Sequence, residues 1–308
     1  MPDVYVTRRV PEPVEDALRE SFDLRSSGAV EAPPRDTLLR AVAGVQGLVT
    51  VPIDRVDAEL LDAAGPQLRI VAQYGVGYDN VDLEAARSRG VVVTNTPDVL
   101  TVATAELTIA LTLALLRRVA EGDRLIRRGE RWSLSPTFLL GSGLAGRTLG
   151  VVGFGRIGRE VARLAAAHGM HVLHASRSSS VPLEQLLAAA DIVTLHTPLT
   201  AETHHLIDDD ALDRMRPRAF LVNTSRGAVV DEDALVRALV DGRIAGAALD
   251  VFEHEPELHP ALRTLENVVL TPHVASATHE AREAMGMLCF EALRDVLLEG
   301  RTPRHLVS

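Results

Sequence analysis

Three ionisable side chains in the second half of the chain each follow an apolar run of the kind that forms a buried strand: Arg226, Glu255 and His273. An arginine guanidinium binds a carboxylate through paired hydrogen bonds and polarises a neighbouring carbonyl. A histidine donates a proton near neutral pH, and a carboxylate on its second ring nitrogen orients the ring and favours its charged form. These residue types together suit proton transfer to the carbonyl of an anionic substrate.

A glycine-rich turn lies upstream of these residues, between the apolar run 148–152 and a segment with helical periodicity. A strand, a tight turn and a helix N-terminus in this order hold a dinucleotide pyrophosphate on backbone N–H groups. Gly153 permits the turn, Gly155 lets the pyrophosphate approach, and Gly158 lets the helix pack on the strand. The alternative is a purely structural turn, but the context favours a cofactor site formed by Gly153, Gly155, Arg156, Ile157 and Gly158.

The end of the next predicted strand bears on which dinucleotide binds. NAD-selective folds place an acidic residue there, about twenty residues after the glycines, to accept hydrogen bonds from the ribose. This chain has Ser176, Arg177 and Ser178 instead. A carboxylate would repel a 2′-phosphate, whereas hydroxyls and a guanidinium would bind it. NADP(H) is therefore favoured, and NAD(H) stays possible because Arg177 could instead be a solvated loop charge.

The carboxyl ends of parallel strands meet at one edge of a sheet, which is where such folds bind ligands. A dinucleotide beside an arginine, a histidine and a glutamate suits reduction of a 2-oxo acid by hydride transfer. We expect further cofactor contacts at strand ends, from His196, Thr197, Pro198, Thr224, Ser225 and Asp250. His196 is predicted to be structural rather than catalytic, and Asp250 could instead be a cap or turn residue.

Histidines outside this group are predicted to have no chemical role. His204 and His205 lie in a polar loop, and His254 and His259, near Glu255, are expected to be bystanders. The spacing of the histidine and acidic residues does not indicate a metal site, and hydride transfer needs no metal. The sequence therefore predicts no metal.

Composition excludes several classes of protein. The chain has 308 residues, a formal net charge of −10 and no lysine, all 32 Lys or Arg residues being arginine. The acidic balance argues against nucleic acid or an anionic membrane as partner, and the missing lysine excludes a Schiff base. The single cysteine, Cys289, excludes a disulfide framework. The apolar segment 99–116 contains Glu106, which indicates a buried helix rather than a membrane span. We expect no signal peptide and a cytoplasmic location.

Alternating apolar runs and amphipathic segments predict an α/β fold with two doubly wound parallel sheets. The dinucleotide-binding domain, 99–279, is inserted into a flavodoxin-like substrate domain, 1–98 plus 280–308. A long helix over 99–128, with Asp98 as N-cap, links the two, and 129–147 is an irregular excursion. Strands are predicted at 4–6, 47–50, 68–72, 91–94, 148–153, 170–175, 191–195, 219–223, 246–249 and 267–270, and first-domain helices at 12–20, 35–42 and 54–63.

These motifs together resemble the D-isomer-specific 2-hydroxyacid dehydrogenase family nearly end to end. The resemblance implies that Arg226 binds the substrate carboxylate and carbonyl, Glu255 is the partner carboxylate, and His273 is the acid/base. It also implies that Asp250 lies near the nicotinamide carboxamide. The segment Gly75-Val76-Gly77-Tyr78-Asp79-Asn80-Val81-Asp82 matches the loop whose N–H groups at Val76 and Gly77 hold the substrate carboxylate, and Thr104 matches a cofactor phosphate contact.

Within the family, the segments 96–101, 104–107 and 272–279 look most like glyoxylate/hydroxypyruvate reductases, which often prefer NADPH. Two alternatives stay open. One is a dehydrogenase for a bulkier or phosphorylated substrate such as D-3-phosphoglycerate. The other is a non-catalytic dinucleotide-binding protein similar to the C-terminal binding protein corepressors. A homodimer formed through the long helix and the excursion is implied by the resemblance alone.

Overall fold

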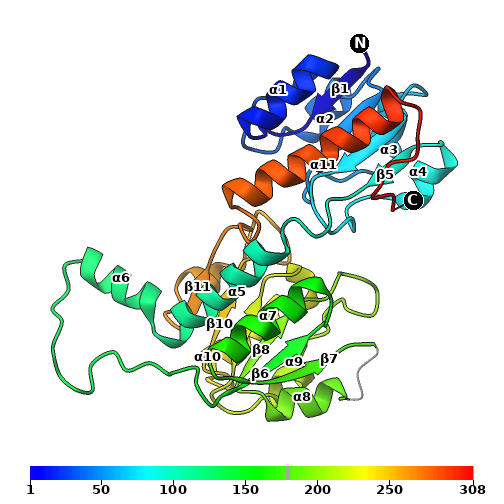
Figure 1. The fold of residues 1–308 in the computed structure, drawn as a ribbon. Helices are drawn as coiled ribbons and strands as arrows, with labels where there is room; N and C mark the ends of the chain where they lie inside the picture. The colour runs from blue at the N-terminus through cyan, green and yellow to red at the C-terminus, as the bar shows by residue number, and fades with distance from the viewer. Residues whose placement is uncertain (178–180, 308) are drawn as a thin grey trace. The chain divides into compact units, whose positions relative to one another are not determined.

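The computed structural model describes residues 1–177 and 181–307, which form two compact units (Figure 1). One unit combines Met1–Leu100 with Ser276–Ser308, and the other is Thr101–Ala275. The boundaries expected from the sequence, after residues 98 and 279, lie close to these divisions. Within the ranges that the structure describes, the helices are too short or too polar to span a bilayer.

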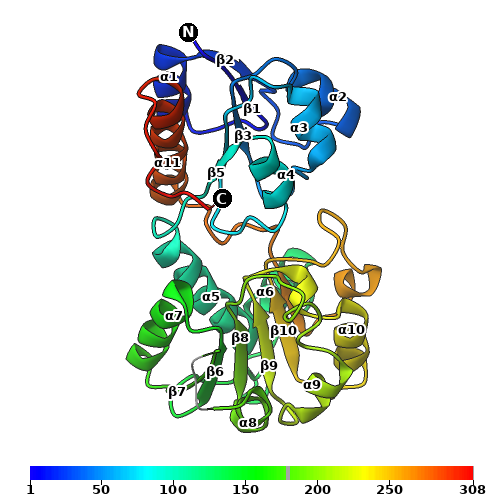
Figure 2. The same ribbon diagram turned by 90° about the vertical axis from the view of Figure 1, so that its right-hand side faces the viewer.

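The first unit is built on a five-stranded parallel sheet in the order β2-β1-β3-β4-β5, a flavodoxin-like arrangement. Helices cover both faces of this sheet (Figure 2). The strands are β1 (Asp3–Val6), β2 (Asp23–Ser26), β3 (Gly47–Thr50), β4 (Ile70–Gln73) and β5 (Val92–Thr94), and the helices are α1 (Glu12–Ser21), α2 (Arg35–Ala41), α3 (Ala58–Ala64), α4 (Leu83–Ser88) and α11 (His279–Leu297).

Side chains that alternate along these strands produce the two layers. Tyr5, Leu48 and Val71 belong to a core shared with helices α2, α3 and α4. Helices α1 and α11 pack together, and they do so closely because a Cβ added at Gly286 would lie 2.5 Å from the Val14 side chain. The chain that follows the second unit therefore belongs to the first unit, where it forms α11.

The second unit contains six parallel strands in the order β11-β10-β9-β8-β6-β7. Strand β6 has β7 on one side and β8 on the other, so the order in which strands are added to the sheet reverses next to β6, and such folds bind ligands at this point. The strands are β6 (Thr148–Val152), β7 (His171–Ala175), β8 (Ile192–Leu195), β9 (Phe220–Asn223), β10 (Gly246–Leu249) and β11 (Val268–Leu270), and the helices are α5 (Thr101–Leu116), α6 (Val119–Arg127), α7 (Arg156–Ala167), α8 (Leu183–Ala189), α9 (Asp209–Arg214) and α10 (Glu232–Val240).

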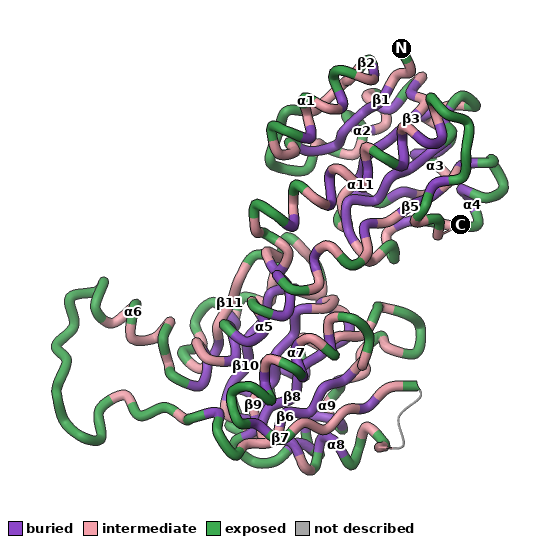
Figure 3. The backbone as a smooth tube through the Cα atoms, viewed as in Figure 1, coloured by how far each residue is buried: buried purple, intermediate pink, exposed green. Residues whose placement is uncertain are grey.

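Helices α5 and α7 share one core with one face of this sheet, and α8, α9 and α10 share another with the opposite face. Leu149 and Val151 point into the first core, whereas Val152 belongs to the second. The inner strands β6, β8, β9 and β10 are accordingly drawn mostly as buried in Figure 3. The predicted fold class, with two parallel sheets, is confirmed.

The single long helix predicted over 99–128 is wrong. Helix α5 ends at Leu116 and α6 begins at Val119, because Arg118 adopts a left-handed backbone with φ of 54°. The Leu116 carbonyl accepts a hydrogen bond from Ser142 N (2.8 Å), part of the chain returning from the excursion. Asp98 is not the N-cap either, since its φ is 71° and α5 starts at Thr101.

Two local elements of the first unit differ from the prediction. Strand β2 was not predicted because Asp23-Leu24-Arg25-Ser26 is not an apolar run; it is an edge strand paired only with β1. Helix α3 begins at Ala58 rather than at residue 54, because Asp57 caps it by accepting a hydrogen bond from Leu60 N. Helix α4 was not predicted and is capped in the same way by Asp82.

Candidate active site

The glycine turn joins β6 to α7 with the geometry of a phosphate-binding loop. Gly153 has φ of 90°, and a Cβ placed there would lie 2.5 Å from the carbonyl oxygen of His196. A Cβ at Gly158 would lie 2.1 Å from the Gly153 carbonyl oxygen, so only glycine allows α7 to pack this closely. By contrast, no described atom lies within 4 Å of a Cβ built at Gly155, the N-cap of α7. This open space at a helix N-terminus fits a pyrophosphate.

The strand end after β8 borders the same turn. Thr197 Cγ2 lies 2.9 Å from a Cβ built at Gly153, and Thr197 Oγ1 is buried without a hydrogen-bond partner among the described residues. A buried orphan hydroxyl suits a ligand contact. His196 Nε2 is 2.9 Å from the Thr194 hydroxyl, and burial lowers the pKa of His196 to about 3. His196 is therefore neutral at physiological pH, next to Thr197 and Pro198 at the predicted cofactor edge.

The predicted selectivity residues follow β7. His174 in this strand stacks on Phe154 of the glycine turn, with ring centroids 3.9 Å apart. Ser176 is half-buried and Arg177 is exposed, whereas Ser178 lies outside the described residues. The charge of Arg177 contributes to a lowered pKa of Glu202, whose largest cause is the hydrogen bond from the Thr200 hydroxyl. Glu202 is therefore close enough to Arg177 for an electrostatic interaction between the two side chains.

Arg226 follows β9 in a turn that Asn223 organises. The Asn223 side chain donates to the Arg226 carbonyl (2.8 Å) and accepts from Ser225 N and Oγ (3.0 and 2.8 Å). Next in the chain, a Cβ at Gly227 would lie 1.8 Å from the Phe252 carbonyl carbon, so this turn packs directly on the segment that carries Glu255. The packing fixes the arginine turn relative to the glutamate.

Glu255 and His273 form a pair within the second unit. Glu255 Oε2 lies 2.7 Å from His273 Nδ1, and Oε1 accepts a hydrogen bond from Phe252 N (2.9 Å). The carboxylate is thus held by the backbone, while 32% of the histidine side chain stays exposed. The pair engages His273 Nδ1, so Nε2 is the ring nitrogen that is left available for proton transfer.

Asp250 organises the turn that presents His273. Its carboxylate accepts hydrogen bonds from the Thr271 hydroxyl (2.6 Å), Val274 N (2.9 Å) and Ala275 N (2.8 Å), and its carbonyl accepts from His273 N (2.7 Å). Burial raises the pKa of Asp250, and these hydrogen bonds oppose that increase. His273 has φ of 52°, a left-handed conformation that these surrounding bonds maintain.

Two further predicted cofactor contacts lie on the α5 side of the second sheet. Thr104 is buried in α5, and its carbonyl accepts a hydrogen bond from the Thr108 hydroxyl (2.8 Å). The same hydroxyl is 2.9 Å from the Thr224 hydroxyl, so Thr224 ties the end of β9 to α5. The contact with the Thr108 hydroxyl thereby fixes the position of the Thr224 side chain.

The loop containing Val76 and Gly77 belongs to the first unit, where side chains hold its carbonyl groups. Asn95 Nδ2 donates to the Val76 carbonyl (2.8 Å), and Gln73 Nε2 donates to the Gly77 carbonyl (3.2 Å) and to Asn80 Oδ1 (2.8 Å). The Val76 carbonyl shares a peptide group with the Gly77 N–H, and the Gly75 carbonyl, which accepts from Thr96 N (3.0 Å), shares one with the Val76 N–H. These bonds fix the orientation of both N–H groups, as a backbone anion site needs.

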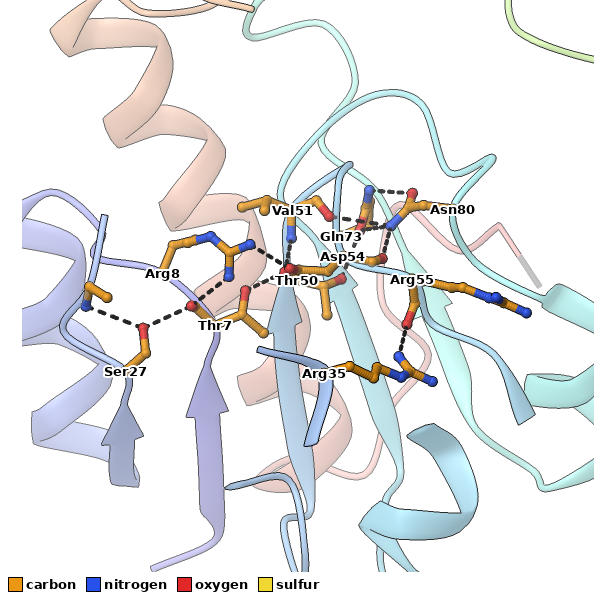
Figure 4. Close-up of polar contacts among 11 residues, drawn as sticks. Thr7, Arg8, Ser27, Arg35, Thr50, Val51, Asp54, Arg55, Gln73 and Asn80 are labelled. Atoms are coloured by element: carbon orange, nitrogen blue, oxygen red, sulfur yellow. Dashed lines mark hydrogen bonds and ion pairs between the residues drawn. The ribbon is translucent and has the colours of Figure 1, made fainter. Parts of the chain in front are cut away.

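A buried ion pair supports this loop from below, as Figure 4 shows. Asn80 Nδ2 donates to the Asp54 carbonyl (2.7 Å), and the Asp54 carboxylate accepts from Thr7 Oγ1 (2.5 Å) and Arg8 (2.6 Å). Arg8 and Asp54 are both nearly inaccessible to solvent. The pair links the ends of β1 and β3 to the loop, and sequence reasoning missed it because the partners are 46 residues apart.

The second unit as a whole defines a class of protein. A glycine turn at the switch point of a six-stranded parallel sheet, with an arginine turn packed against a glutamate–histidine pair, is the arrangement of a dinucleotide-dependent oxidoreductase. The chain belongs to the D-isomer specific 2-hydroxyacid dehydrogenase family, whose NAD binding domain model matches residues 109–275. The predicted family resemblance is confirmed.

Similar proteins of known name cover the whole chain. The glyoxylate reductase of Thermococcus litoralis is 48% identical over 323 aligned residues, which span 100% of this chain and 97% of that protein. A crystal structure of a protein from Thermus thermophilus has 47% identity and a TM-score of 0.91, covering 99% of this chain and 100% of its own. The NADPH-dependent glyoxylate/hydroxypyruvate reductase of Sinorhizobium meliloti, in complex with NADP and malonate, has 36% identity and a TM-score of 0.84, with 100% and 97% coverage.

Proposed function

We propose that this protein reduces glyoxylate, hydroxypyruvate or a similarly short 2-oxo acid to the D-2-hydroxy acid, with NADPH preferred over NADH. The observation that carries the proposal is the 2.7 Å pair of His273 and Glu255, in the same unit as the glycine turn. The names of the similar reductases from Thermococcus litoralis and Sinorhizobium meliloti support the substrate class.

Each residue has one task in this proposal. The bound nicotinamide supplies the hydride to the carbonyl carbon. His273 Nε2 donates the proton to the carbonyl oxygen, and Glu255 stabilises the charged imidazole through Nδ1. Arg226 binds the substrate carboxylate and polarises the carbonyl. The N–H groups of Val76 and Gly77 are proposed as the anion-binding groups of the first unit.

The cofactor is proposed to lie along the carboxyl edge of the second sheet. Its pyrophosphate binds the N–H groups at the start of α7, from Arg156, Ile157 and Gly158. Asp250 is assigned to the nicotinamide end, in addition to its observed hydrogen bonds in the His273 turn. The other proposed contacts are those of Thr104, Ser176, Arg177, Ser178, His196, Thr197, Pro198, Thr224 and Ser225.

The test is the initial rate of NADPH and NADH oxidation with glyoxylate, hydroxypyruvate, pyruvate and a branched 2-oxo acid. We expect saturating turnover with the two small polar substrates and NADPH. Faster turnover of the branched 2-oxo acid would change the substrate assignment but would leave the proposed reaction unchanged. Absence of turnover with all four, despite cofactor binding, would overturn the proposed activity and leave a dinucleotide-binding protein.

Cofactor preference is tested at the end of β7. We expect Ser176→Asp to shift the ratio of kcat/KM for NADPH to that for NADH towards NADH by roughly tenfold or more, because a carboxylate repels the 2′-phosphate. Ser176→Asn has nearly the same size without the charge and is the matched control. An unchanged ratio in Ser176→Asp would show that Ser176 does not face the 2′-phosphate.

We also propose a cytoplasmic homodimer. Helix α6 has no buried residue, and the chain that follows it is drawn mostly as exposed in Figure 3. In this excursion the side chains of Trp132 and Leu134 are 59% and 90% exposed. An apolar surface of this kind is typical of a protein interface. The single cysteine agrees with a reducing compartment.

The dimer is tested by solution mass. We expect sedimentation equilibrium to give twice the chain mass of 33.2 kDa for the wild type and a lower average mass for Trp132→Ser/Leu134→Ser. Val30→Ser removes an apolar side chain that is 81% exposed in the first unit and serves as the control. A monomeric wild type would refute the assignment.

A further inference from the structure

Two histidines and a glutamate that the sequence analysis set aside come together in the second unit. His204, His205 and Glu253 each present a potential ligand atom, and these atoms all lie within 4.8 Å of one another. The two imidazole rings stack with centroids 4.0 Å apart, and His205 Nε2 lies 2.6 Å from Glu253 Oε1. Spacing in the sequence could not reveal the group, because Glu253 is 48 residues from His205.

The backbone holds His205 in position. His205 N donates to the Ala228 carbonyl (2.8 Å), and Ile207 N donates to the Val229 carbonyl (3.0 Å), both just after the Arg226 turn. His205 has φ of 50°, a left-handed conformation that is uncommon for a residue with a side chain. Such a conformation persists where surrounding contacts impose it, so the ring is directed by the fold rather than by its own preference.

Glu253 is fixed independently of the histidines. Its Oε2 accepts a hydrogen bond from Glu232 N (3.2 Å) at the start of α10, and its own N–H donates to Glu232 Oε2 (3.2 Å). Burial raises the pKa of Glu253, but the hydrogen bonds from His205 and Glu232 lower it to a net value below the ordinary one. The carboxylate is therefore ionised at neutral pH with one oxygen directed at His205.

The second nitrogen of the His205 ring also has an acidic neighbour. Asp231 Oδ2 lies 4.0 Å from His205 Nδ1, while Asp231 Oδ1 caps α10 through Ala234 N (2.8 Å). Histidines that bind metals commonly direct their other ring nitrogen at a carboxylate, which sets the tautomer and makes the ring a stronger ligand. His205 thus lies between an ionised carboxylate on Nε2 and another on Nδ1.

We propose that His204, His205 and Glu253 form a binding site for a divalent transition-metal ion of the Zn²⁺ type. Two imidazoles and one carboxylate are ligands that Zn²⁺ takes in proteins, with bonds of about 2.0–2.2 Å and a fourth position for water. Ligand atoms at these distances from a tetrahedral ion are about 3.4 Å apart. The His205–Glu253 pair needs to open slightly, and the exposed His204 ring, which stacks on His205, needs to approach.

The ion would replace the contact between His205 Nε2 and Glu253 Oε1, so that both atoms bind the metal instead of each other. It would also join two segments around the candidate active site. One is the 203–207 loop, bonded to the residues after Arg226, and the other is the 252–255 segment, in which Phe252 N donates to Glu255. Because the ion binds the folded arrangement, it should stabilise the native state.

The site is tested with Zn²⁺ alone and with protein lacking any affinity tag, cofactor or substrate. Isothermal titration is expected to give one site per chain, and Co²⁺ is expected to give visible absorption bands of a tetrahedral complex. His204→Ala and Glu253→Gln should each weaken binding by roughly tenfold or more, and the rise in Tm with Zn²⁺ should be smaller than in the wild type. His171→Ala removes an exposed histidine of β7 and is the matched control.

Equal Zn²⁺ affinity in the wild type, His204→Ala and Glu253→Gln would overturn the site, as would the absence of binding to the wild type. His204→Ala changes an exposed side chain and tests the site even if Glu253→Gln fails to fold. The measurement is independent of the proposed reduction. A reductase that binds no Zn²⁺ refutes only the metal site, whereas a Zn²⁺-binding protein without turnover refutes only the proposed function.

Discussion

His273→Asn is expected to lower kcat by roughly two to four orders of magnitude while NADPH still binds, since general acid catalysis contributes about this much. Asparagine is the appropriate replacement because residue 273 has φ of 52°, and asparagine tolerates that conformation better than alanine does. The three hydrogen bonds that the Asp250 carboxylate accepts in this turn come from other residues and stay available. Stopped-flow turnover and cofactor fluorescence titration give the two quantities.

Glu255→Gln is a milder substitution in the same pair, and its kcat is compared with that of His273→Asn. It keeps the size of the side chain and an oxygen near His273 Nδ1, but it removes the charge that favours the protonated imidazole. We expect a smaller loss of kcat than in His273→Asn. Near-wild-type turnover in His273→Asn would remove this histidine as the acid, whatever Glu255→Gln shows.

The fold was predictable where the signal is local. Of the eleven strands in the described residues, ten were predicted as apolar runs bounded by turns, and the Gly153–Gly158 motif follows one of them directly. Strand β2 was not predictable in this way, because it is held by pairing with β1 and not by its own apolar pattern. The helix break at Arg118 was not predicted for a related reason. The sequence Leu-Leu-Arg-Arg-Val-Ala-Glu is compatible with a continuous helix, and at the break the Leu116 carbonyl accepts a hydrogen bond from Ser142 N, which is distant in the sequence.

The candidate site was predictable in its reactive residues and not in the residues that hold them. Arginine, glutamate and histidine in this order indicate a chemistry, so they can be recognised in a sequence. Asn223 and Gln73 reveal nothing until the turns they bond are seen in space. Asp250 was predicted as a cofactor contact, yet what the structure shows is its support of the His273 turn. Residues that act through tertiary hydrogen bonds have partners far away in the sequence, so no pattern of residue types at a fixed sequence spacing identifies them.

Arg226→Ala is expected to raise KM for the 2-oxo acid and to lower kcat, reducing kcat/KM by roughly two to four orders of magnitude. The guanidinium is proposed to bind the carboxylate in the ground state and to stabilise charge on the carbonyl oxygen in the transition state, so both parameters should change. The dissociation constant of NADPH should stay within about twofold of the wild type. Steady-state kinetics with glyoxylate and a separate NADPH titration measure these effects.

Arg226→Lys separates charge from geometry. An ammonium keeps the positive charge but cannot form the paired, planar hydrogen bonds of a guanidinium, so we expect it to recover only part of the lost kcat/KM. Arg263→Ala, which changes an exposed arginine of the 3-10 helix Pro260–Arg263, controls for loss of one positive charge from the unit. Because Asn223 bonds the Arg226 carbonyl and Gly227 packs on Phe252, the turn is held without the arginine side chain. A loss of cofactor affinity in Arg226→Ala therefore could not be explained by collapse of the turn. If cofactor affinity were the only property to change, the proposed substrate role of Arg226 would be contradicted.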